Sequence, residues 1–165
     1  MKEINHKNKF FISLATVFGV GRIPKAPGTW GSLVTLPLAF LLLKLGPIIY
    51  MISTLILIIL SIFAADQYEN QSATHDSKEI VIDEVVGMLV TMTWLPITWQ
   101  SFVASFVLFR FFDILKPFPI SYFDRKVPGG FGVVVDDLVA GMIANVILQV
   151  ILYQTAWLGV QIQTA

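Results

Sequence analysis

Four long stretches of this 165-residue chain contain no Asp, Glu, Lys or Arg. They cover residues 26–43, 45–65, 85–109 and 138–165. Part of the second, IIYMISTLILIILSIFAA (48–65), would form a helix about 27 Å long, close to the ~30 Å hydrocarbon core of a bilayer. One such stretch could be the buried helix of a soluble protein. Four of them in so short a chain favour a protein embedded in, or associated with, a membrane.

The composition supports this interpretation and excludes several functions. Hydrophobic residues make up 56% of the chain and charged residues only 13%, whereas about a quarter of an ordinary soluble domain is charged. The formal net charge is zero, so the chain has no basic excess for binding nucleic acid. The absence of cysteine excludes disulfides, thiolate metal sites and a cysteine-dependent phosphatase mechanism. The length predicts a single domain, residues 1–165.

Glycine and proline divide the chain into helical segments. The loop and turn signals are GVGRIPKAPGTWGS (19–32), KLGP (44–47), LPITW (95–99), KPFPI (116–120) and VPGG (127–130). No alternation of polar and apolar residues lasts long enough to predict a sheet. We therefore expect an all-α fold: a compact bundle of about six helices with short helical hairpins, membrane-embedded or membrane-associated.

The first expected helix begins near Lys9. The basic residues before an apolar stretch could instead belong to a signal peptide, but no small-residue cleavage site follows them. We predict a retained helix, and the early lysines place the N-terminus in the cytoplasm. The other expected helices are 32–43 paired with 48–65, 85–95 paired with 99–113, and a last helix beginning at Asp136.

Hairpins of this kind would bring the polar segments together. The loop 19–31, the segments 66–84 and 110–128, and the Asp136–Asp137 pair would lie at one end of the bundle. Ten of the eleven acidic residues fall in the last three of these regions. The arms 85–95 and 99–113 would be about 16–22 Å long, shorter than a bilayer core. We therefore expect a partly embedded hairpin and a polar site at the membrane surface.

Two similar motifs, VIDEVVGM and VVDDLVAGM, each place a carboxylate four residues before a glycine. Asp83 and Gly87 share a helix face, as do Asp137 and Gly141, and glycine permits close approach of another helix. The acids could be helix N-caps, but a cap needs only one carboxylate, and adjacent carboxylates repel. A divalent cation would relieve the repulsion. Oxygen ligands without cysteine or histidine indicate Mg²⁺ or Mn²⁺.

Two further motifs suit a phosphorylated ligand. In RFFDILKPFPISYFDRK (110–126), Arg110, Asp113 and Lys116 recur at i+3 spacing on an otherwise apolar helix. They could be a weak intrahelical ion pair, but ionisable groups at a membrane usually mark function. In KAPGTWGS (25–32), a glycine-rich turn precedes a helix. Thr29 or Ser32 could cap that helix or donate to a bound anion.

The motifs PGTWGS, HD…IVIDEVVGM, FRFFDILKPFPISYFDR and GGFGVVVDDLVAGMIAN, in this order, closely resemble the phosphatidylglycerophosphatase A family. The resemblance runs from about Thr16 to about Asn145. It implies a Mg²⁺-dependent lipid phosphatase, multi-pass in the bacterial inner membrane, with its active site on the cytoplasmic side. It also implies a compact helical bundle built around a central helix. Ile82 stands where some relatives carry Trp, which affects packing rather than chemistry.

The resemblance implies hydrolysis of the terminal phosphate of phosphatidylglycerophosphate. On this hypothesis the ligands of one or two Mg²⁺ ions are Asp83, Glu84, Asp113, Asp136 and Asp137. The phosphate-binding residues are Arg110, Lys116, Arg125, Thr29 and Ser32. The catalytic residues are Lys116 and the carboxylates of Asp83 and Asp137, one of which is the base. The further matching positions are Gly31, His75, Asp76 and Asp124, and we expect His75 to be polar surface.

Several alternatives stay open at this level. Phosphate transfer to water, or to an aspartate that becomes an aspartyl-phosphate, would use the same residues. Paired intramembrane acids would also suit a small ion-coupled transporter, and a membrane scaffold would need no site at all. The expected partners are a phospholipid substrate and the membrane, with no nucleic acid. The oligomeric state and the preference among lipid phosphates are left open.

Overall fold

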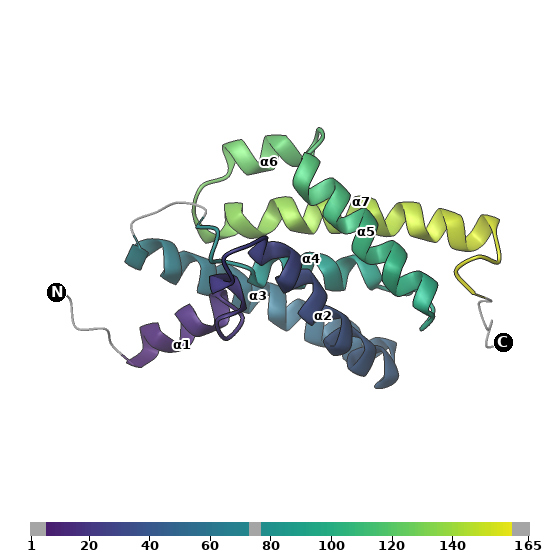
Figure 1. Ribbon diagram of the computed structural model, residues 1–165, viewed down its shortest axis with the longest axis horizontal. Coiled ribbons are helices and arrows are strands. Elements are labelled where there is room, and N and C mark those ends of the chain that lie inside the picture. The colour runs from purple at the N-terminus through teal and green to yellow at the C-terminus, as the bar shows by residue number, and fades with distance from the viewer. Residues whose placement is uncertain (1–5, 73–76, 160–165) are drawn as a thin grey trace.

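The computed structural model describes residues 6–72 and 77–159. Within these ranges the chain is entirely helical, as predicted, with seven α-helices and one short 3₁₀-helix, η1 (Figure 1). The elements are α1 (His6–Ala15), η1 (Val20–Arg22), α2 (Pro27–Lys44), α3 (Pro47–Ser72), α4 (Ile82–Met92), α5 (Trp99–Leu115), α6 (Ile120–Lys126) and α7 (Gly129–Gln154). The helix beyond the six that were expected is α6, which follows the proline-rich corner after α5.

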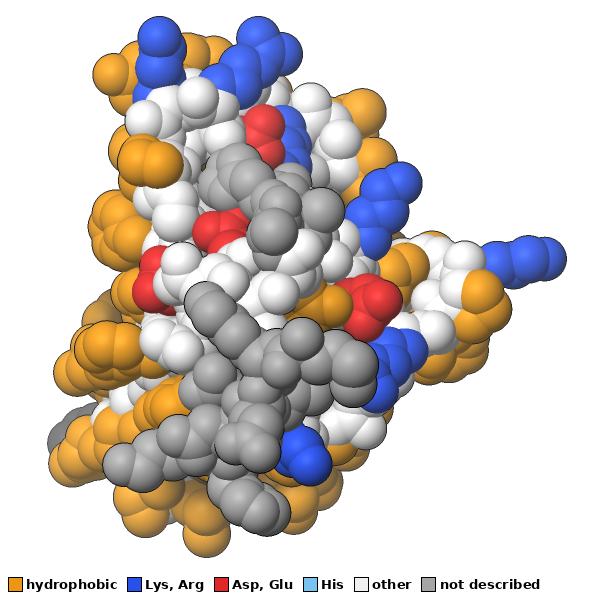
Figure 2. Space-filling view, turned by 90° about the vertical axis from the view of Figure 1, so that its left-hand side faces the viewer, with side chains coloured by type: hydrophobic (Ala, Val, Ile, Leu, Met, Phe, Trp, Pro, Cys, Tyr) orange, Lys and Arg blue, Asp and Glu red, His pale blue; other side chains and the backbone are white. Residues whose placement is uncertain are grey.

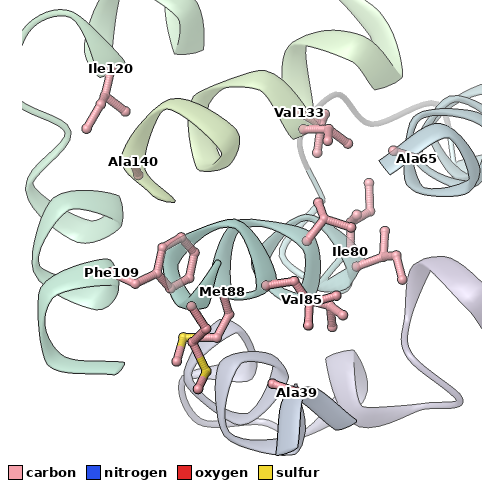
Figure 3. Packing of buried hydrophobic residues seen from close by; sticks show 14 of the residues in the cluster. Ala39, Ala65, Ile80, Val85, Met88, Phe109, Ile120, Val133 and Ala140 are labelled. Carbon is pink, nitrogen blue, oxygen red and sulfur yellow. The ribbon is translucent and has the colours of Figure 1, made fainter. Parts of the chain in front are cut away.

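The short helix α4 forms the centre of the bundle. Nine of its eleven residues are buried, and it contacts α2, α3, α5 and α7. Figure 3 shows Val85 and Met88 of α4 surrounded by side chains from the other helices, including Ala39 of α2 and Phe109 of α5. Beyond its first turn, α4 is apolar on nearly all sides, and a helix of this kind is stable only when it is enclosed. The expected bundle around a central helix is therefore confirmed.

The C-terminal end of α4 lies inside the protein, and α7 satisfies its backbone. The amide of Asn145 donates to the carbonyl oxygens of Thr91 and Thr93, each at 2.8 Å. Gln149 donates to the Thr93 carbonyl at 3.1 Å. A helix of this length is only about 16 Å long. Because it ends inside the bundle, its last carbonyls take their hydrogen bonds from side chains of α7.

Two helices, α3 and α7, are long and apolar enough to cross a membrane. Each has 26 residues, and the apolar windows of α3 and α7 are 28% and 56% buried. The outer face of α3 exposes a row of aliphatic side chains, among them Ile52, Leu55 and Ile59. Exposure of so much apolar surface to water is unfavourable, which indicates membrane association.

The last helix begins earlier than the sequence predicted. We expected a turn at 127–130 and a helix start at Asp136, but α7 begins at Gly129. Gly130, which we assigned to the turn, instead allows close packing, as does Gly132. A Cβ on Gly130 would lie 2.4 Å from the carbonyl oxygen of Ile62 in α3, and one on Gly132 would lie 1.8 Å from the Val127 carbonyl.

The start of α2 also differs from the prediction. The helix begins at Pro27, and Ala26 is its N-cap residue in a left-handed conformation with φ of 51°. Thr29 and Ser32 therefore lie inside the helix, and neither caps it. The Ser32 hydroxyl donates to the Gly28 carbonyl oxygen at 2.9 Å. Proline at the first helical position explains the early start, since its missing N–H has no helical partner in any case.

The polar segments gather at one end, as the hairpin argument predicted. Gly21 of η1 packs on the Glu79 backbone, Gly28 packs on Glu84, and Gly129 packs near Asp66. Figure 2 looks onto this end of the molecule: acidic and basic side chains lie on the face, and hydrophobic side chains line its margins. The bundle therefore has one charged end and extensive apolar flanks.

Candidate active site

Three of the four paired acids are buried and Glu84 is partly buried, and neither pair supplies an N-cap. Asp83 and Glu84 lie in the first turn of α4, whose N-cap residue is Val81. Asp136 and Asp137 lie well inside α7 and are only 4% and 3% exposed. The capping alternative is therefore wrong for all four carboxylates. Their burial requires another source of compensation.

Three of these carboxylates converge. Helices α4 and α7 cross closely at Gly87 and Gly141, each one turn beyond an acid. One oxygen each from Asp83, Glu84 and Asp137 lie within 4.8 Å of one another. The pairing of acid and glycine seen in the sequence thus has the predicted consequence: the glycines admit close helix contact, and the acids meet beside it.

The three-carboxylate group fits a hard divalent cation. Asp83 Oδ1, Glu84 Oε2 and Asp137 Oδ2 are buried and have no hydrogen-bond partner among the described residues. Burial, and then the neighbouring charge of Glu84, raise the pKa of Asp83 well above its usual range. Burial likewise raises the pKa of Glu84 to about 6. A cation ligated by these oxygens would offset both the desolvation and the mutual repulsion.

Arg110 lies beside this group, near the end of α5. Its Nη1 is 3.7 Å from Glu84 Oε1 and also pairs with Asp113. The i,i+3 ion pair considered from the sequence is therefore present, but it is also joined to the carboxylate group. Asp113, a predicted metal ligand, is not one of the three converging acids. Its charge nevertheless acts on both Asp83 and Asp137.

Lys116 provides a second cation from the corner between α5 and α6. It is the C-cap residue of α5, with φ of 42°, so it lies just beyond the helical stripe on which we placed it. Its Nζ is 2.6 Å from Asp136 Oδ2 and also pairs with Asp124 of α6. Burial acts to lower the pKa of Lys116, but these two carboxylates outweigh it, and the pKa is raised.

Asp136 thus faces Lys116 through one oxygen. Its other oxygen, Oδ1, is buried without a partner among the described residues. Asp136 is outside the group of three, yet its charge acts on Asp83 and Asp137. The five predicted acidic ligands therefore form one electrostatic cluster, which has two cations at its edge.

The remaining predicted residues are less closely placed. Arg125 is exposed near the end of α6 and has no ion pair with a described residue of the cluster. Thr29 is partly buried in the first turn of α2. Ser32 is fully buried. Its hydroxyl donates a hydrogen bond to the Gly28 carbonyl oxygen, so in this arrangement it cannot donate one to a phosphate. His75 and Asp76 lie outside the described residues.

Two contacts of the site were not predicted from the sequence. Asp124 binds Lys116, although eight residues and a proline-rich corner separate them. Gly28 packs against both Glu84 and Arg110, and a Cβ on it would lie 1.9 Å from Glu84 Oε1. Neither contact follows from helical spacing, because each depends on how separate helices are placed.

Comparison with known proteins agrees with this arrangement. The family model described as phosphatidylglycerophosphatase A matches residues 13–152. A phosphatidylglycerophosphatase A of Haemophilus influenzae is 42% identical over 93% of this chain and 94% of its own length. That of Escherichia coli is 41% identical over 82% of this chain and 79% of its own.

A protein of Bacteroides thetaiotaomicron, provisionally named a phosphatidylinositol-3-phosphatase, is 33% identical over 84% of this chain and 91% of its own. No solved structure gives a significant match. The family match covers most of the chain, including every carboxylate of the cluster. The chain belongs to the phosphatidylglycerophosphatase A family.

Proposed function

We propose that this protein hydrolyses the terminal phosphate of phosphatidylglycerophosphate, giving phosphatidylglycerol and inorganic phosphate. The observation that carries the proposal is the buried group of Asp83, Glu84 and Asp137 beside two cations, at the charged end of an apolar bundle. Family membership supports the same reaction. A phosphate monoester on a lipid needs this combination: charge for the phosphoryl group and an apolar surface for the acyl chains.

Asp83, Glu84 and Asp137 would hold Mg²⁺, with Asp136 and Asp113 next to them. When bound, the ion supplies positive charge to the phosphoryl oxygens and polarises them. The residues of the chain do the rest. Arg110 and Lys116 would bind the remaining phosphoryl oxygens, and their charges become more effective in a site from which water is excluded.

A water molecule would attack phosphorus as the bond from phosphorus to the glycerol oxygen breaks. Asp83 or Asp137 would take a proton from the water and return it to the leaving alkoxide. Because two carboxylates raise the pKa of Lys116, this side chain stays protonated and acts as a fixed charge rather than as the acid that protonates the leaving alkoxide. The alternative is attack by a carboxylate of the cluster, giving an aspartyl-phosphate. Rapid quench of a reaction with ³²P-labelled substrate separates the two routes: label bound to protein would overturn direct attack by water.

The apolar flanks suggest how the protein meets its substrate. We propose that α3 and α7 cross the bacterial inner membrane and that the charged end lies at its cytoplasmic surface, in one catalytic domain. A lipid in that leaflet would present its phosphate to the cluster while its acyl chains stay beside the helices. This arrangement would need no large movement of the lipid out of the bilayer.

The proposal is tested with purified protein in mixed micelles. Phosphate release is measured with phosphatidylglycerophosphate, phosphatidylinositol 3-phosphate and phosphatidic acid, each with EDTA and after Mg²⁺ is restored. We expect Mg²⁺-dependent release, fastest with phosphatidylglycerophosphate. Faster release from phosphatidylinositol 3-phosphate, the substrate class in the name of the Bacteroides relative, would overturn the substrate assignment. Absence of release from all three lipids would overturn the proposal itself.

A further inference from the structure

The side chain of Lys116 is held by two carboxylates from two different helices. Asp124 belongs to α6 and Asp136 to α7, and both contact the same Nζ atom. The backbone at Lys116 is left-handed, with φ of 42°. A left-handed residue commonly ends a helix. The position of the ammonium group is instead determined by its contacts with Asp124 and Asp136, which come from two other helices.

A lysine that binds phosphate gains from such restraint. Its four-carbon stem is flexible, and its ammonium carries three N–H donors. The two carboxylates engage two of these donors and leave the third. We propose that Asp124 is a positioning residue, which holds the Lys116 ammonium against Asp136 so that its remaining N–H is available to the substrate phosphate. This inference rests on the phosphatase function proposed above.

The two carboxylates differ in their surroundings. The Asp136 side chain is 6% exposed and belongs to the buried cluster, whereas the Asp124 side chain is 30% exposed. Asp124 is not part of the three-carboxylate group. A partly exposed ion pair contributes little to the stability of the fold. We therefore expect loss of the Asp124 contact to change the position of the Lys116 ammonium group, and to leave the stability of the fold and the binding of metal largely unaltered.

The experiment measures steady-state hydrolysis of phosphatidylglycerophosphate by the full-length protein in mixed micelles. The variants are Asp124→Asn, Asp124→Glu, Lys116→Ala and the double variant Asp124→Asn with Lys116→Ala. Asp66→Asn is the matched control: it removes one acidic charge at the same end of the molecule, from a side chain that accepts from Asn70. Thermal unfolding and the Mg²⁺ concentration for half-maximal activity are measured for each.

We expect Asp124→Asn to lower kcat/KM about 10- to 100-fold, as misplacement of a substrate-positioning group does, and to raise KM. If the variant were merely less well folded, the apparent kcat would fall and the KM of the remaining folded protein would not change. The Mg²⁺ requirement stays as in the unmodified protein, and Asp124→Glu recovers most of the activity. In the Lys116→Ala background, Asp124→Asn has no further effect, because the two side chains act as a unit.

Unchanged kinetics in Asp124→Asn would overturn the inference, and so would losses that multiply in the double variant. A shift in the Mg²⁺ requirement would also overturn it, by making Asp124 part of the metal site. If Asp124→Asn does not fold, Asp124→Ala decides, made alone and together with Lys116→Ala: a raised KM only while Lys116 is present supports the inference, and an equal change in both backgrounds overturns it. Inactive unmodified protein would instead contradict the proposed function, so the two failures are distinguishable.

Discussion

Gly87 of α4 and Gly141 of α7 bring the backbones of two helices into direct contact. A Cβ on Gly141 would lie 2.4 Å from the Gly87 carbonyl oxygen, and one on Gly87 would lie 2.9 Å from the Asp137 carbonyl oxygen. The Thr91 hydroxyl donates to the Gly87 carbonyl within α4 at 2.9 Å and lies 3.5 Å from the Gly141 carbonyl oxygen of α7. Asp83 and Asp137 each precede one of these glycines by one turn. The convergence of the three carboxylates therefore depends on the absence of two side chains.

Gly141→Ala should separate α4 from α7, because the new methyl group meets backbone that cannot rotate away. We expect a loss of about 1–3 kcal/mol in the free energy of unfolding, typical of overpacking, and at least a tenfold rise in the Mg²⁺ concentration needed for activity. Chemical denaturation and Mg²⁺ titration measure the two effects. Met142→Ala, at an exposed position of the same helix, is the control. Normal Mg²⁺ dependence in Gly141→Ala would show that the crossing does not set the site.

Asp83→Asn and Asp137→Asn should each abolish Mg²⁺-dependent phosphate release while folding and membrane insertion are kept. The amide removes a ligand charge but retains the volume of the side chain. Because a bound ion stabilises the folded state, Mg²⁺ should raise the melting temperature of the unmodified protein and of Asp66→Asn, but not that of either variant. The thermal shift in detergent checks this independently of activity. Full activity in both purified variants would refute the assigned site.

Lys116→Ala should chiefly weaken the binding of the substrate phosphate. Removing a charge that contacts the phosphoryl group raises KM and lowers kcat/KM, by roughly 100-fold if the interaction strengthens in the transition state. The comparison is made in mixed micelles at saturating Mg²⁺. Should the kinetics be unaltered, Lys116 would be an internal counterion of Asp136 with a structural role only.

Asn145→Leu should destabilise the protein without altering its chemistry directly. The substitution leaves the carbonyl of Thr91 without its donor and removes one of two donors from Thr93. An unsatisfied buried polar group costs about 1–3 kcal/mol. Unfolding in detergent should show this loss, whereas Val146→Ala, at an exposed neighbouring position, should change little. An Asn145→Leu variant as stable as the unmodified protein would mean that water reaches the end of α4.

Local features of the sequence are sufficient to predict the helical fold, the charged end and the acidic residues that gather there. These follow from local signals: uncharged runs predict the helices α3 and α7, turn residues predict the hairpins, and the acid–glycine spacing is a property of a single helix face. Gly46 is one example, because its positive φ of 102° permits the short turn between α2 and α3. Local signals failed at Gly130, where glycine serves packing instead of a turn, at the start of α2, and at α6, which was not expected.

Which carboxylates converge, and which form ion pairs with a cation, depends on the packing of the helices. Asp136 and Asp137 are adjacent in sequence, yet one faces Lys116 and the other joins Asp83 and Glu84. Successive residues of a helix point about 100° apart, so adjacent acids must face different neighbours. The helices that supply those neighbours are far apart along the chain, and the contacts between them depend on how the bundle packs, which spacing within one helix does not determine.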